Sequence, residues 1–230
     1  MASEAILSRV EFRAATAADV PRLAVILNDP PPTETLAIVG SVARAHLAGR
    51  MMIDAGLTVE LGRTVVAIEG GEVVGLLEAA AAEEGHEPGI STVLKLAPVV
   101  LARLGPQAFV RTLRWMRINP RVQFEPVPGA YHVFELDVAA SHRGRGIGGA
   151  LLDRAEIAAR ACGHRCITLT TKVTNPARRL YERHGFRVIG TKLDAEWARW
   201  ASSPGRVQMM KDLERDAGRR EPSHGWRAVP

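Results

Sequence analysis

The glycine-rich segment SHRGRGIGGALL, at residues 141–152, constrains the fold of this chain more than any other part of the sequence. Four glycines and two arginines in it precede an apolar pattern of helical spacing. Glycine lets the backbone take up positive φ angles and leaves its amide groups open to a ligand. Amide groups at the beginning of a helix also bind anions. The segment therefore predicts either a phosphate-binding turn or a simple break between two elements.

Two phosphate-binding templates fit these residues. Gly144, Gly146 and Gly149 spell G-x-G-x-x-G, the dinucleotide-binding turn, whereas Arg143, Gly146 and Gly148 spell R-x-x-G-x-G. A dinucleotide-binding fold begins early in a chain and places an acid for the ribose about 20 residues after its glycines. Here the turn lies past the middle of the chain, and the segment TLTTK at that spacing has no carboxylate. A P-loop is also excluded, because no Lys-Ser/Thr pair follows the glycines.

The charge of the chain is concentrated around this segment. From Ser141 to Gly190 there are ten basic and three acidic residues, a net charge of +7, so the rest of a chain with net charge +5 carries −2. A basic segment centred on glycines favours a multiply phosphorylated ligand. Nucleic acid is the competing interpretation. We expect no nucleic-acid partner, because the arginines are scattered among apolar residues without an aromatic platform or a known binding motif.

Short strands and helices alternate along the whole chain. Gly70 and Gly71 separate two β-branched runs, which is typical of a hairpin. Two amphipathic helices, 91–104 and 106–118, are separated by Gly105-Pro106. Strands are expected at 10–16, 64–80 (the hairpin), 131–138, 166–173, 186–191 and 206–213, helices at 18–27, 34–56, 149–162 and 175–185, and a loop around Trp197 and Trp200.

The stretch from 131 to 190 resembles the GNAT superfamily of N-acetyltransferases. The strand YHVFELDV, the loop RGRGIG and the later helix NPARRLYERHG occur together at the spacing of that family. The resemblance implies an α/β (α+β) GNAT fold, in which a central mixed, mostly antiparallel sheet is flanked by helices. It also implies one acetyltransferase domain over residues 1–212, with a helical insertion at about 83–130 between the third and fourth strands. Residues 213–230 are polar and rich in turn formers, so we expect a disordered tail there.

The resemblance implies acetyl-CoA as co-substrate and no metal. In the family the R-x-x-G-x-G loop wraps the pyrophosphate of coenzyme A, and the strand before it binds the pantetheine arm where it splays from its neighbour. A side chain at Gly144, Gly146 or Gly148 would block the approach of a pyrophosphate. Arg143 and Arg145 either add charge or are solvated, and Asn175 both caps a helix and touches the ligand. The implied cofactor-binding residues are Leu136, Val138, Arg143, Gly144, Arg145, Gly146, Ile147, Gly148, Gly149 and Asn175.

The implied reaction, attack of a neutral amine on a thioester, needs one residue that donates a proton. The departing thiolate must be protonated, and in the family a tyrosine at the position of Tyr181 points at the sulfur. The alternative is that Tyr181 only packs in the core, with its hydroxyl bound by a backbone group.

The residue that removes the amine proton is open between three alternatives. Strict alternation along the strand 131–138 places His132 on one face and Glu135 on the other. Several family members carry their base at the position of His132, and the unperturbed pKa of imidazole, ~6.5, suits the task. Glu135 is the rival, particularly if a β-bulge disturbs the alternation. The third alternative is that the proton leaves through water molecules alone, without a protein base.

The acceptor is expected to be a primary amine on a small molecule or a peptide. The net negative charge of the chain outside residues 141–190 favours a cationic amine as the acceptor. The alternative function is a regulatory module that binds acyl-CoA without turnover. The insertion, with Phe109, Trp115 and Met116, could roof the acceptor site, form a homodimer surface or add to the core.

The sequence also gives an expectation about where the protein works. Cys162 and Cys166 are too few for a disulfide framework, and their spacing lacks the second ligand pair of a zinc site. No apolar stretch approaches the roughly 20 residues that cross a bilayer, and the first residues lack a signal-peptide core. We therefore expect a cytoplasmic protein with no membrane partner.

Overall fold

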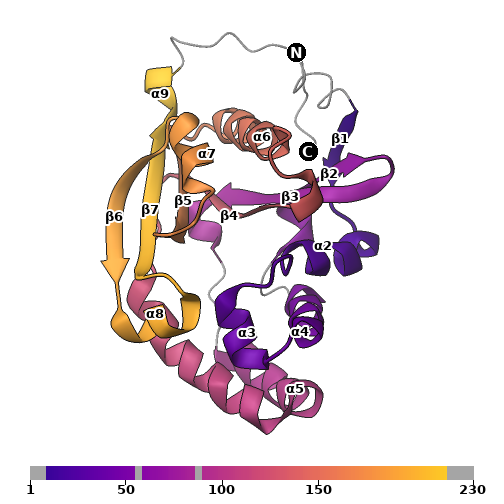
Figure 1. Cartoon of the computed structure of the whole chain (residues 1–230). Coiled ribbons are helices and arrows are strands. Elements are labelled where there is room, and N and C mark those ends of the chain that lie inside the picture. Colours follow the sequence, from indigo (N-terminus) through magenta and orange to yellow (C-terminus); the bar gives the residue numbers. More distant parts are fainter. Residues whose placement is uncertain (1–8, 55–58, 86–89, 217–230) are drawn as a thin grey trace.

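The computed structural model describes residues 9–54, 59–85 and 90–216. Over these residues the chain forms a seven-stranded sheet of order β1-β2-β3-β4-β5-β7-β6, with helices on both faces (Figure 1). The strands are β1 (Val10–Ala14), β2 (Thr64–Glu69), β3 (Glu72–Ala81), β4 (Tyr131–Val138), β5 (Cys166–Lys172), β6 (Arg187–Leu193) and β7 (Gly205–Asp212).

The helices follow the chain order expected from the sequence, with three differences: a helix around Trp197, the division of the helix expected over 34–56, and a helix that begins at Leu213. A capping box between Thr16 and Asp19 precedes the first of them. They are α2 (Val20–Ile26), α3 (Thr33–Val39), α4 (Val42–Asp54), α5 (Ile90–Ile118), α6 (Ile147–Ala161), α7 (Arg178–Arg183), α8 (Ala195–Ala201) and α9 (Leu213–Asp216).

The sheet is mixed and mostly antiparallel, as predicted. β2 and β3 form the expected hairpin, and both glycines of its turn, Gly70 and Gly71, have positive φ. Within the described sheet, β4 and β5 are the parallel pair. Their register joins Tyr131–Val133 to Ile167–Leu169 and goes no further, although both strands continue. The sheet therefore splays open between the carboxyl-terminal halves of β4 and β5.

Helices cover the two faces of the sheet unequally. α6 buries Leu151, Leu152 and Ala155 against one face, where α7 adds Tyr181 to the same core. On the other face α2 packs against β2 and β3, with Leu23 fully buried. α3, α4 and α5 lie farther from the sheet on this second side (Figure 1).

The expected insertion between the third and fourth strands is confirmed. α5 consists of two helical halves that meet at Gly105, which has φ 80° and ψ 169°. The kink lies where the sequence places Gly105-Pro106. Residues of α3, α4 and α5 form their own small core around Val39, Ala45, Leu104 and Ala108.

The segment around Trp197 and Trp200 was expected to be a loop, and this is wrong. Asp194 accepts a hydrogen bond from the Trp197 amide and so starts the helix α8. Trp197 is fully buried, because the ring of Trp115 from α5 packs 6.0 Å from it and 6.3 Å from Trp200. Trp115 therefore belongs to the core between α5 and α8, whereas Met116 is exposed.

Two further boundaries differ from the sequence expectation. The helix expected over 34–56 is divided into α3 and α4, because Gly40 takes the left-handed conformation at the end of α3. The tail expected from 213 begins instead with α9, whose Leu213 is buried in the main core. The remainder of the expected tail, 217–230, lies outside the described residues. Over the described chain, no helix combines the length and the apolar character that crossing a bilayer needs.

Candidate active site

The glycine loop follows β4 and leads into the amino terminus of α6. Gly144 has φ 78°, and Gly146, the residue before the helix, has φ 88°. A β-carbon on Gly144 would meet no atom within 4 Å, so the loop is open on that side. The first amides of a helix have no acceptor within it, and the helix dipole is positive there. The arrangement provides a site that fits the pyrophosphate of the implied acetyl-CoA.

The last two glycines of the loop have a different structural reason. Gly148 and Gly149 are not at positive φ. A β-carbon on Gly148 would lie 3.1 Å from the side chain of Leu180, and one on Gly149 would lie 3.2 Å from the ring of His184. These two glycines therefore let α7 approach α6 closely, a constraint that the sequence analysis missed.

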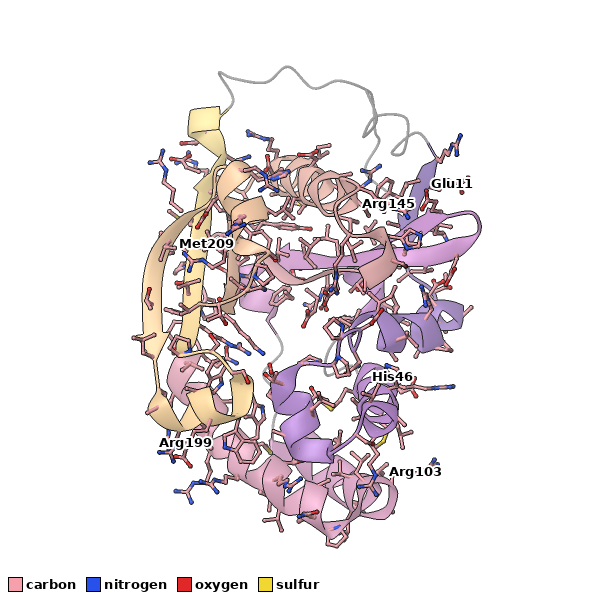
Figure 2. The ribbon with its side chains drawn as sticks, viewed as in Figure 1. Glu11, His46, Arg103, Arg145, Arg199 and Met209 are labelled. Carbon is pink, nitrogen blue, oxygen red and sulfur yellow. The ribbon has the colours of Figure 1, made fainter. Side chains whose placement is uncertain are left out.

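The two arginines of the loop hold it in place. Arg143 donates from Nε to the carbonyl of Val138 (2.8 Å) and from Nη2 to the carbonyl of Asp29 (2.7 Å). Arg145 donates a hydrogen bond to Glu69 at the end of β2 (3.3 Å). Figure 2 shows Arg145 close to β1 and β2. Both side chains thus have protein partners in addition to any contribution to the charge of the loop.

A β-bulge in β4 decides which side chains face the opening. β3 pairs Glu78 with Glu135 and Ala79 with Val133, so Phe134 is the extra residue. Val133 and Leu136 both pack against the core under α6, as Val138 does. Because side chains alternate on either side of the bulge, Glu135 and Asp137 point to the opposite face, together with His132. Strict alternation, which separated His132 from Glu135, is therefore wrong.

The two carboxylates beyond the bulge are partly buried and hard to ionise. Burial raises the pKa of Glu135 to about 8, with further contributions from the nearby charges of Asp137 and Glu78. Burial also raises the pKa of Asp137 to about 6. A carboxylate with a pKa near neutral is a much stronger base than an exposed one, which suits proton removal from an ammonium group.

Tyr181 lies on α7, in the core under α6, near enough to Asp137 and Glu135 for their charges to act on its hydroxyl. Its side chain is buried, and its ring packs at 6.2 Å from Phe186. Burial raises the pKa of the Tyr181 hydroxyl, and the charges of Asp137 and Glu135 raise it further. The hydroxyl therefore remains protonated at neutral pH and can donate a proton.

His132 lies at the closed end of the opening, where β4 and β5 still pair. Its Nδ1 atom is 2.8 Å from the hydroxyl of Thr168, its cross-strand partner, and its ring packs on Phe134. Burial lowers the pKa of His132 to about 4. The structure thus brings Glu135, Asp137 and Tyr181 together and leaves His132 in a packed position.

Asn175 holds the turn before α7, although its position before Pro176 predicts that it is the cap residue. The helix begins at Arg178, and Ala177 is its N-cap residue. The side-chain oxygen of Asn175 accepts a hydrogen bond from the Ala177 amide (2.9 Å), and its amide group donates to Thr171 on β5 (2.6 Å). Asn175 thereby fixes α7, and with it Tyr181, to the end of β5.

Glu78 is the site residue that the sequence analysis missed. It is 2% exposed, Arg63 donates to its Oε1 at 2.8 Å, and its Oε2 is buried without a hydrogen bond in the described structure. Arg63 also lies over the ring of Phe134, the bulge residue, at 4.6 Å. An acid inside the otherwise apolar strand EVVGLLEAAA is the signal that could have indicated it.

A splayed parallel pair with a glycine loop and a helix amino terminus at its open end is the arrangement that the resemblance to the GNAT superfamily implies. Residues 111–188 match the family model described as an acetyltransferase (GNAT) domain. The match covers 78 of the 230 residues and includes β4, the glycine loop, α6, β5 and α7, the elements that form the site.

Comparisons with other proteins agree on the fold. No curated protein matches the chain significantly. Among solved structures, a GCN5-related N-acetyltransferase from Kribbella flavida is 20% identical, with TM-score 0.51 over 90% of this chain and 99% of that one. The PaiA N-acetyltransferase from Thermoplasma acidophilum, solved with coenzyme A, is 15% identical, with TM-score 0.51 over 88% of this chain and 98% of that one. A further acetyltransferase structure is 20% identical, with TM-score 0.54 over 88% of this chain and 99% of that one.

Proposed function

We propose that the protein is an N-acetyltransferase that transfers the acetyl group of acetyl-CoA to a primary amine of a small molecule or peptide, by direct attack in a ternary complex. The observation that carries this proposal is the opening between β4 and β5. The glycine loop and the start of α6 follow β4 at its open end, and Glu135, Asp137 and Tyr181 interact electrostatically with one another. We also propose that residues 1–212 act as one domain in the cytoplasm.

Acetyl-CoA supplies a thioester whose acyl group the amine accepts. The amides of Gly146 to Gly149 at the start of α6 would hold its pyrophosphate, since they are free of helical partners. The backbone of Leu136 and Val138, on the strand that has left its neighbour, would hold the pantetheine arm. The coenzyme A bound to the Thermoplasma acidophilum relative supports this assignment by analogy.

Glu135 is the group that we propose removes the proton. Its carboxylate faces the opening, and a pKa of about 8 means that it can accept a proton from an ammonium group of similar acidity. The hydroxyl of Tyr181 would give a proton to the departing thiolate. His132, held by Thr168, is less suited to this role because its ring is packed where the strands still pair.

The chemistry of the surrounding side chains supports a cationic acceptor. Glu78, Glu135 and Asp137 lie on one face of β3 and β4, and of these Glu78 has an arginine at hydrogen-bond distance. Buried carboxylates are stabilised by a cation or by protonation. An ammonium group at the opening would provide that cation.

Calorimetric titration with acetyl-CoA, followed by an assay of thiol release with a panel of primary amines, tests the proposal. Gly144→Asp places a negative charge on the loop, and Gly144→Asn is its neutral control of the same shape. Both residues tolerate the left-handed conformation. We expect the wild type and Gly144→Asn to bind, and Gly144→Asp to bind at least tenfold more weakly. Binding without transfer to any amine would indicate the regulatory acyl-CoA module instead.

Tyr181→Phe tests the proton donor. We expect kcat to fall by about a hundredfold, because the thiolate would leave unprotonated, while the Kd for acetyl-CoA changes little. Phenylalanine preserves the packing against Phe186, so thermal unfolding should be almost unchanged. A wild-type kcat in this variant would remove Tyr181 from the mechanism.

A further inference from the structure

The inserted segment that contains α5 has an unusual charge composition. From residue 90 to residue 124 there are six basic residues and no acidic residue, namely Lys95, Arg103, Arg111, Arg114, Arg117 and Arg121. This basic region is separate from the glycine loop, and the proposed transfer reaction does not use it. Figure 2 shows Arg103 directed outwards at the far end of the molecule from the sheet.

Large apolar side chains are exposed on the same helix. Val110 is 63% exposed, Leu113 45% and Met116 37%. The inner side of this half of α5 packs instead through Ala108, Trp115 and Ile118. Because Val110, Leu113, Arg114 and Arg117 follow the spacing i, i+3, i+4 and i+7, the outer face of α5 combines apolar and cationic side chains.

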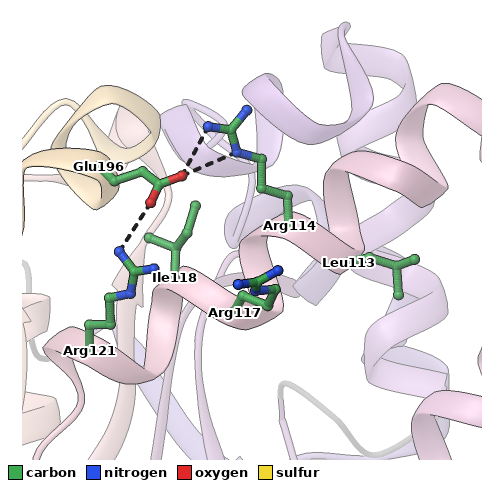
Figure 3. A pocket seen from close by; sticks show the side chains of 6 residues that line it. All are labelled: Leu113, Arg114, Arg117, Ile118, Arg121 and Glu196. Atoms are coloured by element: carbon green, nitrogen blue, oxygen red, sulfur yellow. Dashed lines mark hydrogen bonds and ion pairs between the residues drawn. The ribbon is translucent and has the colours of Figure 1, made fainter.

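A surface cavity of about 400 Å³ lies at the carboxyl-terminal end of this face (Figure 3). Arg114 and Arg121 hold Glu196 of α8 between them, at 2.9 and 3.0 Å. Arg117 lies between these two arginines along the helix, and over the described ranges it has no ion-pair partner. Arg121 also pairs with Asp194 at 3.5 Å, so the three guanidinium groups at the cavity face two carboxylates and leave a net charge of +1. Its lining residues are Leu113, Arg114, Arg117, Ile118, Arg121 and Glu196.

These features together select one kind of partner. A second copy of the chain would bring like charges together. Single-stranded nucleic acid is bound by exposed aromatic side chains, but Trp115 here packs against Trp197 and Trp200. An anionic bilayer matches both the cationic and the apolar side chains of this face. Its headgroups attract arginine, and its acyl region takes up exposed valine, leucine and methionine.

We propose that the outer face of α5, formed by Val110, Leu113, Arg114, Met116 and Arg117, docks on an anionic phospholipid surface together with Arg121 from the 3-10 helix Asn119–Val122 that follows. The arginine-lined cavity takes phosphate-bearing headgroups, and the exposed apolar side chains enter the boundary of the acyl region. The expectation that the chain has no membrane partner depended on the lack of a spanning stretch. A helix that lies on the surface does not need one.

Co-sedimentation of the full chain with vesicles tests this inference. We expect binding to vesicles of phosphatidylcholine with phosphatidylserine, weakened by salt, and little binding to phosphatidylcholine alone. Arg117→Gln should lower the partition coefficient about fivefold, because one arginine near an anionic surface contributes about 1 kcal/mol. Leu113→Ser should also lower the partition coefficient. The factor by which it does so should be similar at low and at high salt, because the contact that is lost is apolar.

Matched controls lie on α6, on the other side of the sheet (Figure 1). Arg160→Gln removes one exposed arginine and Ile157→Ser one exposed apolar side chain, and neither should change the partition coefficient. Equal binding to both kinds of vesicle, or an equal loss in the α6 variants, would overturn the inference. So would self-association or RNA binding through α5 without vesicle binding. Because acetyl transfer is not measured, the outcome is independent of the proposed function.

Discussion

The pKa of Glu135 results from one extra residue in a strand. The bulge at Phe134 directs the carboxylate to the face that carries Asp137, opposite the core under α6. Burial there raises its pKa to about 8, and Asp137 and Glu78 add to the effect. The pKa of an exposed glutamate at the same position would stay near the ordinary value of 4.5, and its carboxylate would be a poor base for an amine.

This pKa predicts the pH dependence of the reaction. A general base must be ionised, so kcat/KM should be low below pH 7 and rise through an apparent pKa of about 8. The measurement should use an acceptor amine of low pKa, so that its own ionisation does not contribute to the profile. Glu135→Gln should lower kcat/KM by about a hundredfold or more and abolish this limb.

The same profile distinguishes Glu135 from the rival base. A base at His132 would give a limb near pH 4, because burial lowers its pKa to about that value. His132→Gln should leave the limb near pH 8 in place if the ring only packs against Thr168 and Phe134. A profile that loses its limb in His132→Gln and keeps it in Glu135→Gln would reverse the assignment.

At the scale of the elements, α6 and α7 are in contact through a glycine. The missing side chain of Gly148 leaves room for Leu180, which a β-carbon would approach to 3.1 Å. Gly148→Val should therefore destabilise the protein by about 1–3 kcal/mol, measured by urea unfolding. Gly62→Val is the control, because no atom lies within 4 Å of a β-carbon there.

A second substitution shows whether this contact is the cause. Leu180→Ala makes room beside residue 148, so the loss in Gly148→Val/Leu180→Ala should be smaller than the sum of the two single losses. The coupling should amount to about 0.5–3 kcal/mol, as for other side chains in direct contact. Additive losses would show that the valine acts through the local backbone instead.

For the whole molecule, the buried site predicts how stability changes with pH. The folded pKa of Glu135 is above its unfolded value of 4.5, so the native state binds the proton more tightly. This contribution is fully present below pH 4.5 and is lost as the pH rises towards 8. His132, whose folded pKa is lowered from 6.5 to about 4, acts in the opposite direction but only below pH 6.5.

The free energy of unfolding should therefore fall between pH 6.5 and 8. One titrating group limits the slope to about 1.4 kcal/mol per pH unit. Urea unfolding of the wild type and of Glu135→Gln at pH 6.5, 7.25 and 8 measures the difference. The variant should show a flatter dependence, and parallel curves for the two proteins would show that Glu135 is not buried in this way.

The sequence by itself determined the features that depend on neighbours along the chain. The hairpin at Gly70-Gly71, the glycine turn before α6, the turn held by Asn175 and the break at Gly105 each follow from a local conformational preference. The order of strands and helices and the GNAT resemblance over 131–190 follow from the same patterns. Boundaries failed where the local signal was weak, as at α8.

The tertiary structure decided what depends on residues far apart in the sequence. The bulge at Phe134 arises from pairing with β3, and the burial that raises the pKa of Glu135 comes from the surrounding elements. The partners of Arg143 and the reason for Gly148 lie on other elements as well. These properties are set by packing and electrostatics between distant segments, and a local pattern carries no record of which segments will meet.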